Sequence, residues 1–136
     1  MRLRTLVPGG DRDRKRIVAL ALDSGGAPAE RFLEELFQKR KKDYGRTLAL
    51  LSVYQKHGEV PEGKSKPITD YAGIFELRPT SQVRILYFNL PGEIVVLVDG
   101  IIKRTDKDRR LRQKYKQAEK IRESFLREME REKRGT

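Results

Sequence analysis

The chain of 136 residues contains no cysteine and only one histidine, His57. The lack of cysteine excludes disulfide bonds, thiolate metal ligands and a cysteine nucleophile. A single imidazole does not make up a transition-metal site, so we expect neither a metal nor another cofactor. His57 lies at the end of a predicted helix, which favours a surface or capping role over that of a general base.

Long apolar stretches are also missing. No run approaches the roughly 20 residues that a membrane-spanning helix needs, and the charged N-terminus lacks the apolar core of a signal peptide. We therefore expect a cytoplasmic protein that does not contact a membrane. The sequence contains no HExxH motif, P-loop or dinucleotide fingerprint, which excludes the enzyme classes built on them.

Positive charge is abundant and clustered. The 31 lysines and arginines outnumber the 20 acidic residues, giving a formal net charge of +11. Residues 103–116 alone hold eight cations against Asp106 and Asp108. Basic proteins are often merely soluble, but clustering of the charge favours a polyanionic partner such as RNA.

Residues 73–100 predict three consecutive strands, over 74–78, 83–89 and 93–99. β-branched and aromatic residues fill these runs, and proline and glycine separate them, as is typical of an antiparallel meander. The second run alternates, with Val83, Ile85 and Tyr87 on one face. The third is apolar almost throughout, which predicts a strand covered on both faces.

The remaining segments predict an α+β protein. Residues 15–22 form a plausible first strand, helices are expected over 28–38 and 43–57, and a third from Arg109 to about Glu132. We expect a small antiparallel sheet of about four strands, with the two N-terminal helices packed on one face and the other face or rim available. The C-terminal helix docks by one narrow apolar stripe. Residues 1–14 are predicted to be a flexible extension and residues 15–132 a single domain.

An arginine within such a small sheet is expected either to pair with an acidic residue or to serve a function. Guanidinium groups grip phosphate oxygens in bidentate fashion and stabilise the charge that develops when RNA is cleaved through its 2′-hydroxyl. A carboxylate beside them takes the proton or forms a cross-strand ion pair, and the sequence leaves both roles open for Glu76. The candidate catalytic residues are Arg78, Arg84, Arg104 and Glu76. Five further cations are candidate RNA-binding residues. Lys64 and Lys66 belong to the polar loop 59–70, Lys103 follows the last strand, and Arg109 and Arg110 begin the C-terminal helix.

Three segments together resemble a known family. They are GIFELR at 73–78, VRILYF at 83–88 and IVVLVDGIIKRT at 94–105, preceded by APAERFLEEL at 27–36. Their order and spacing are similar to the RelE/HigB toxin superfamily of bacterial type II toxin–antitoxin systems, and most of all to its phage-derived branch. The resemblance covers roughly residues 15–125.

The resemblance implies a microbial-ribonuclease-like fold and cleavage of mRNA in the ribosomal A site. It also implies ribosomal RNA as a contact and neutralisation by a small antitoxin, often a helix-turn-helix protein. By position, Arg84 matches the arginine that contacts the scissile phosphate, and Arg104 with Lys103 matches the basic pair after the last strand. Arg78 matches the arginine of the family's ELR motif.

Several positions depart from that pattern. Glu76 and Ile74 stand where the RelE branch proper places lysines, and Arg110 falls at the spacing of its terminal tyrosine. Asp99-Gly100-Ile101 replaces the His-Gly-Phe of the phage-derived branch. These departures leave the proton-transferring group unassigned.

The sequence is compatible with three functions. The first is a ribosome-dependent mRNA endoribonuclease that inhibits translation, which requires Arg78, Arg84 and Arg104 to meet at one pocket. The second is a ParE-like toxin that inhibits gyrase without nuclease chemistry. The third is a non-catalytic RNA-binding adaptor that causes no growth arrest.

Overall fold

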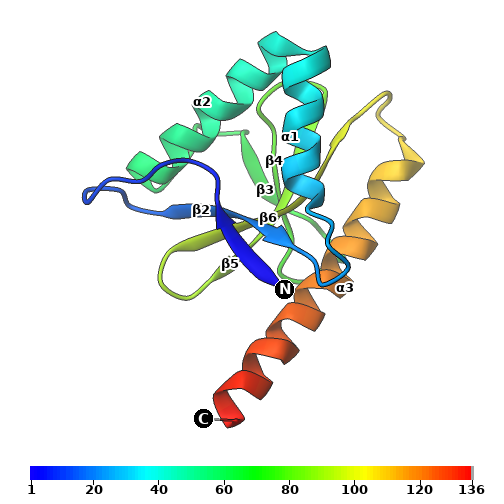
Figure 1. The fold of residues 1–136 in the computed structure, drawn as a ribbon. Coiled ribbons are helices and arrows are strands. Elements are labelled where there is room, and N and C mark those ends of the chain that lie inside the picture. The colour runs from blue at the N-terminus through cyan, green and yellow to red at the C-terminus, as the bar shows by residue number, and fades with distance from the viewer. Residues whose placement is uncertain (136) are drawn as a thin grey trace.

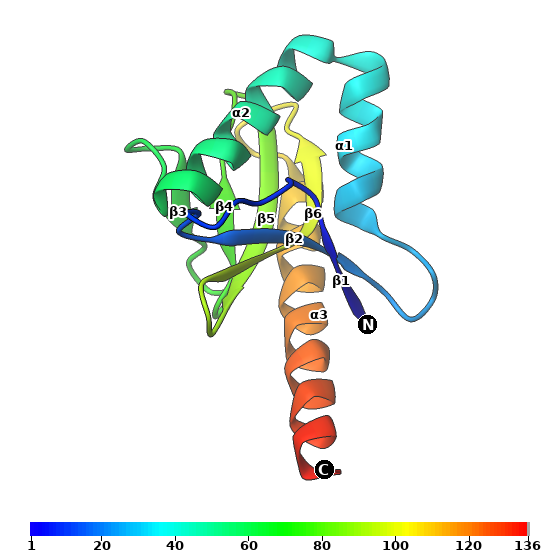
Figure 2. The same cartoon turned by 60° about the vertical axis from the view of Figure 1, so that its left-hand side comes forward.

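The computed structural model describes residues 1–135, in which three helices pack against one sheet (Figures 1 and 2). The helices are α1 (Pro28–Lys39), α2 (Lys41–His57) and α3 (Arg109–Arg134). The strands are β1 (Arg2–Thr5), β2 (Arg16–Ala21), β3 (Ser65–Pro67), β4 (Phe75–Leu77), β5 (Val83–Leu90) and β6 (Ile94–Ile102). The α+β class and the three predicted helices are confirmed.

The six strands form one mixed sheet in the order β1-β2-β6-β5-β4-β3. The predicted meander is present, because β4, β5 and β6 pair antiparallel in sequence order. β2, however, runs parallel to β6, and the long connection that parallel neighbours need consists here of α1, α2 and the strands β3, β4 and β5. The prediction of a small antiparallel sheet of about four strands is therefore wrong in strand number and in the direction of β2.

The two strands that the sequence did not predict, β1 and β3, form the edges of the sheet. β1 reads RLRT and β3 reads SKP, so neither shows an apolar alternation. Charges and proline are common on edge strands because they discourage pairing with another chain. The segment expected to be a polar loop over 59–70 thus contains a strand, and Lys66 lies on it.

The expectation of a flexible extension over residues 1–14 is wrong for Arg2–Thr5, which pair antiparallel with β2. The side chain of Leu3 packs against the buried core. Gln55 of α2 holds the chain that follows, since its side-chain amide nitrogen donates to the carbonyl of Val7 at 3.2 Å. The apolar contacts lie singly among charges, which is why the local pattern did not reveal them.

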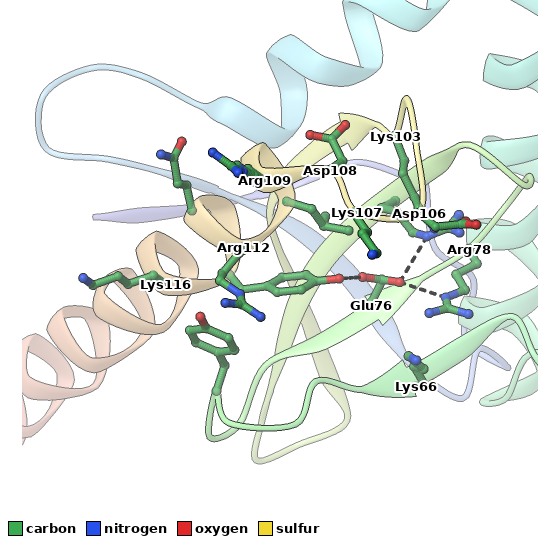
Figure 3. A pocket seen from close by; sticks show the side chains of 15 residues that line it. Lys66, Glu76, Arg78, Lys103, Asp106, Lys107, Asp108, Arg109, Arg112 and Lys116 are labelled. Carbon is green, nitrogen blue, oxygen red and sulfur yellow. Dashed lines mark hydrogen bonds and ion pairs between the residues drawn. The ribbon is translucent and has the colours of Figure 1, made fainter.

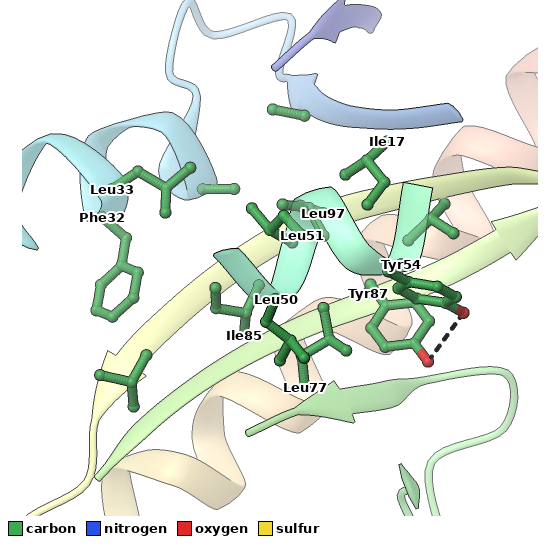
Figure 4. Packing of buried hydrophobic residues seen from close by; sticks show 14 of the residues in the cluster. Ile17, Phe32, Leu33, Leu50, Leu51, Tyr54, Leu77, Ile85, Tyr87 and Leu97 are labelled. Carbon is green, nitrogen blue, oxygen red and sulfur yellow. Dashed lines mark hydrogen bonds between the residues drawn. The ribbon is translucent and has the colours of Figure 1, made fainter. Parts of the chain in front are cut away.

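One face of the sheet is covered by α1 and α2 (Figure 4). Alternate residues of the strands point into this layer, and the helices contribute the facing side chains. Its fully buried members include Ile17, Leu36, Leu51, Leu77 and Leu97. The predicted alternation of β5 is confirmed, because Val83, Ile85 and Tyr87 all belong to this cluster.

The other face is covered by α3, so the expectation that this face stays available is wrong over the length of that helix. Ala118 and Phe125 are its buried residues, and the rings of Phe125 and Phe88 lie 5.9 Å apart. The end of α3 extends beyond the sheet (Figures 1 and 2). The sheet is thus covered on both faces, and its rim remains open to a ligand.

Gly100 marks the tightest contact between α1 and the sheet. A Cβ atom at this position would lie 2.2 Å from Cδ2 of Phe32, whose ring packs directly over β6. We predict that Gly100→Ala destabilises the protein by about 1–3 kcal/mol, because the buried ring must move. Gly45→Ala is the control, since that position on α2 has open space around it and alanine is the better helix former. Urea unfolding measures both, and equal stability of Gly100→Ala and wild type would contradict this packing.

Candidate functional site

A buried carboxylate lies at the rim where β4, β5 and α3 meet. Glu76, in the middle of β4, is fully buried. Its neighbours in β4, Phe75 and Leu77, face the α1 and α2 layer, so the period of two directs Glu76 to the opposite face. Arg84 of β5 points to that same face, where Leu86 pairs directly with Glu76.

Both oxygens of Glu76 are occupied. Oε1 lies 2.8 Å from Nε of Arg78 and 3.1 Å from Nε of Arg84. The Arg78 contact is a hydrogen bond, whereas the Arg84 contact is an ion pair without hydrogen-bond geometry. Oε2 accepts a short hydrogen bond from the hydroxyl of Tyr115 on α3. Glu76 therefore joins three elements of the fold.

Arg84 is committed to the interior of the protein. Its residue is 6% exposed, and Nη1 donates to the carbonyls of Thr80 and Val83, each at 3.0 Å. Burial lowers the pKa of the guanidinium, and the Glu76 carboxylate opposes that shift. These contacts fix the guanidinium of Arg84 and leave only a small part of the residue exposed.

Arg78 is arranged differently. Its side chain is 32% exposed, and only Nε contacts Glu76. The two terminal nitrogens have no hydrogen-bond partner in the described chain, so they present a fork suited to a phosphate or carboxylate. Tyr115 completes the cluster as a donor: burial, followed by its hydrogen bond to Glu76, raises the pKa of its phenol well above the usual range.

The cluster forms the floor of a cavity of about 1010 Å³ between the rim of the sheet, loop 103–108 and the first turns of α3 (Figure 3). Eight cationic side chains and three carboxylates line it. The cations are Lys66, Arg78, Arg84, Lys103, Lys107, Arg109, Arg112 and Lys116, and the acids are Glu76, Asp106 and Asp108. Tyr71, Tyr115, Leu111 and Gln113 complete the lining.

Five of these cations have no carboxylate partner within residues 1–135. Arg109, Arg112 and Lys116 recur at helical spacing along α3, and Lys107 and Lys66 come from the preceding loop and from β3. The carboxylates nearby are already paired, because Asp108 accepts from the backbone and side chain of Arg110. Those hydrogen bonds hold the pKa of Asp108 well below its usual range. The cavity is thus a cationic site with charge left over for an anionic ligand.

The structure brings together six of the nine predicted site residues. Glu76, Arg78, Arg84, Lys103, Lys66 and Arg109 all line the cavity. Arg104 and Arg110 instead line a second cavity of about 670 Å³ beside α1, which also touches Lys103. Lys64 lines neither cavity, and its backbone carbonyl accepts from the amide of Arg78.

The expectation that Arg78, Arg84 and Arg104 meet at one pocket is therefore wrong for Arg104. The chain turns after Ile102, and the side chain of Arg104 leaves on the far side of loop 103–108. Sequence reasoning also missed Lys107, Arg112 and Lys116. The spacing of Arg109, Arg112 and Lys116 was the available signal, because residues three and four apart share one helix face.

Other site types find no support in the described residues. Among residues 1–135, no group of three or more histidine or acidic side chains is arranged to hold a metal ion. None of the helices in this part of the chain is both long enough and apolar enough to cross a membrane.

Comparison with known proteins gives one family match. The family model described as "Phage derived protein Gp49-like" matches residues 31–123, which include every residue that lines the cationic cavity. No curated protein matches the sequence.

Two solved structures are similar in part. A YoeB/ParE toxin from Agrobacterium tumefaciens has a TM-score of 0.48 and 16% identity, over 57% of this chain and 92% of that chain. The YoeB dimer from Staphylococcus aureus has a TM-score of 0.46 and 17% identity, over 59% of this chain and 91% of that one.

Removal of the buried carboxylate should destabilise the fold strongly. In Glu76→Gln the Arg84 guanidinium stays buried without an opposite charge, so we predict a loss of about 3 kcal/mol or more in the free energy of unfolding. Glu93→Gln, which breaks the exposed pair with Lys15, should leave the stability nearly unchanged. Urea unfolding compares the two variants.

A double variant tests the cause. Glu76→Gln with Arg84→Met should be more stable than Glu76→Gln alone, since the unpaired buried cation is then gone. If Glu76→Gln unfolds at the same urea concentration as wild type, the pair is not the desolvated interaction described above.

Proposed function

Because this chain belongs to the Gp49-like family of phage-derived proteins, as its resemblance to the phage-derived RelE/HigB branch implied, we propose that it is the toxin of a toxin–antitoxin pair and cuts mRNA on the ribosome. Neutralisation by a cognate antitoxin, expected to be a helix-turn-helix protein, and action in the cytoplasm are part of this proposal. The observation that carries it is the cationic cavity, with five unpaired cations and an available guanidinium fork.

The cavity suits the backbone of RNA. Phosphate groups recur along a strand, and the cations of α3 recur along one face of the helix beside the sheet rim. The formal net charge of +11 would steer the protein toward ribosomal RNA. In this proposal Lys66, Lys107 and the α3 cations hold the backbone, and Arg78 with Lys103 contacts the phosphate that is cut.

The roles within the buried cluster follow from its contacts. Arg84 acts through Glu76 as a positioning residue, because its guanidinium faces Glu76 and two backbone carbonyls. Glu76 in turn orients Arg78 and Tyr115. Glu76 is a poor proton acceptor for the 2′-hydroxyl, since donors already occupy both of its oxygens.

Another carboxylate has fewer internal partners. Of the three that line the cavity, Asp108 is bound to Arg110, whereas Asp106 is fully exposed and, within residues 1–135, pairs with Lys103 alone, at 3.3 Å. We assign Asp106 as the candidate general base, with Lys103 beside it to stabilise the developing charge.

Glu76 and Arg84 make mainly internal contacts, which favours one alternative, a toxin without nuclease chemistry. A ParE-like toxin that inhibits gyrase by binding alone needs no acid–base group, and the same cationic surface would serve its contacts. This alternative predicts intact mRNA and inhibition of gyrase supercoiling by the purified protein. A non-catalytic adaptor predicts neither effect and no growth arrest.

RNA binding is tested by its dependence on salt. Arg112→Ala should reduce the slope of log affinity against log salt by about 0.7, the value for one phosphate contact on a single strand. Arg131→Ala removes the same charge from the exposed far end of α3 and should leave the slope unchanged. Fluorescence anisotropy with a labelled RNA oligonucleotide measures both, and equal slopes for the two variants would place the binding surface elsewhere.

Cleavage is tested separately, on mRNA bound to translating ribosomes. Arg78→Ala should slow cleavage by about 10²–10³-fold through loss of charge stabilisation. Asp106→Asn should slow cleavage by about 10²-fold or more while RNA affinity stays within twofold of wild type. Primer extension maps the cuts. Growth arrest with uncut mRNA would reject the nuclease in favour of the gyrase-directed toxin.

A further inference from the structure

The cationic cavity also contains an aromatic side chain that phosphate binding does not use. We infer that the cavity takes RNA as a single strand, with one nucleobase stacked on Tyr71 and the adjoining phosphates on Arg112 and Lys116. This inference rests on the proposed function and specifies the form of its substrate.

Tyr71 is presented by a tight turn over residues 68–74. The amide of Ile68 donates to the carbonyl of Ile74 at 2.9 Å, and the amide of Ile74 donates to the carbonyl of Tyr71 at 3.2 Å. Asp70 within this turn has a φ of 74°, in the left-handed region that residues other than glycine rarely adopt. Such backbone persists where the surrounding structure holds it, and it recurs at ligand clamps.

The turn is held against α3. Gly73 has a φ of 76°, and a Cβ atom there would lie 2.4 Å from Cζ of Arg122. The ring of Tyr71 packs against that of Tyr115, with centroids 5.7 Å apart and planes tilted by 52°. Tyr115 is itself fixed by its hydrogen bond to Glu76. Tyr71 is thus held by its neighbour Tyr115, is only half-buried and lines the cavity, so a base stacked on it would meet a ring that is already in place.

Two cations line the same cavity as Tyr71. Arg112 and Lys116 lie on successive turns of α3, line the same cavity and have no carboxylate partner within residues 1–135. A ring bordered by unpaired cations matches the alternation of bases and phosphates along a nucleic-acid strand. In a duplex the bases are stacked on one another and cannot reach the ring, so this arrangement selects an unpaired strand.

The sequence contains no tryptophan, which allows a direct measurement of stacking. Tyr71→Trp introduces a single indole into the cavity, and a stacked base should quench its fluorescence. Phe37→Trp is the matched control, because Phe37 is 51% exposed on α1, on the opposite face of the sheet. We expect single-stranded RNA to quench Tyr71→Trp strongly and Phe37→Trp little. Inorganic polyphosphate, which carries charge without bases, and duplex RNA should quench neither variant.

Affinity gives a second measurement that does not need the tryptophan variant to fold. Tyr71→Phe should bind single-stranded RNA as wild type does, whereas Tyr71→Ala should bind about tenfold more weakly with an unchanged salt slope. Thermal unfolding checks that both variants are folded.

The outcomes separate this inference from the proposed function. RNA binding at wild-type affinity by Tyr71→Ala, or binding to Tyr71→Trp without quenching, would overturn the stacking site and leave the cationic interface in place. Failure of wild-type protein to bind RNA at low salt would overturn both.

Discussion

A fully buried carboxylate that pairs with two guanidinium groups determines how the cationic side of this protein is arranged. A charge removed from water is tolerated only with a close opposite charge and satisfied hydrogen bonds. Glu76 provides the charge, draws Arg84 into the interior and fixes Arg78 through Nε alone. Its second oxygen holds Tyr115, so the same carboxylate ties α3 to the sheet. Together with the packing of Ala118 and Phe125, this contact helps position the helix that supplies most of the unpaired cations.

The charges of the molecule fall into two groups. At the site, Glu76 pairs with Arg78 and Arg84, whereas Arg109, Arg112 and Lys116 on the cavity side of α3 have no carboxylate partner within residues 1–135. Asp108 maintains this division at the start of α3. Its oxygens accept from the amides of Arg104 and Arg110 and from the Arg110 side chain, so it cannot neutralise Arg109 or Arg112. The cavity keeps a net positive charge because Glu76 and Asp108 are already bound to neighbouring arginines.

Much of the fold could be predicted from the sequence, and the failures have physical causes. The strands β5 and β6 and the helices are long and periodic, and burial of one or both faces leaves a clear pattern in them. β1 and β3 are short edge strands whose pairing depends on partners distant in sequence, so RLRT and SKP carry no local signal. The parallel direction of β2 was equally hidden, since it depends on the path of the chain through α1, α2 and three further strands and not on the residues of β2.

The site was less predictable, because the position of an arginine in a sequence motif does not determine whether its side chain faces the interior or a ligand. A cation at position 76 would repel Arg84, whereas the carboxylate of Glu76 attracts it. Once Glu76 is buried, Arg84 must turn inward to pair with it, so the strand arginine expected to contact phosphate becomes part of the wall. Arg78 and the exposed face of α3 are then the groups that can still reach a ligand. The sign of the charge at the centre of β4 thus decides both how far Arg84 is withdrawn from the cavity and which cations, on α3 and at Arg78, remain open to an anionic ligand.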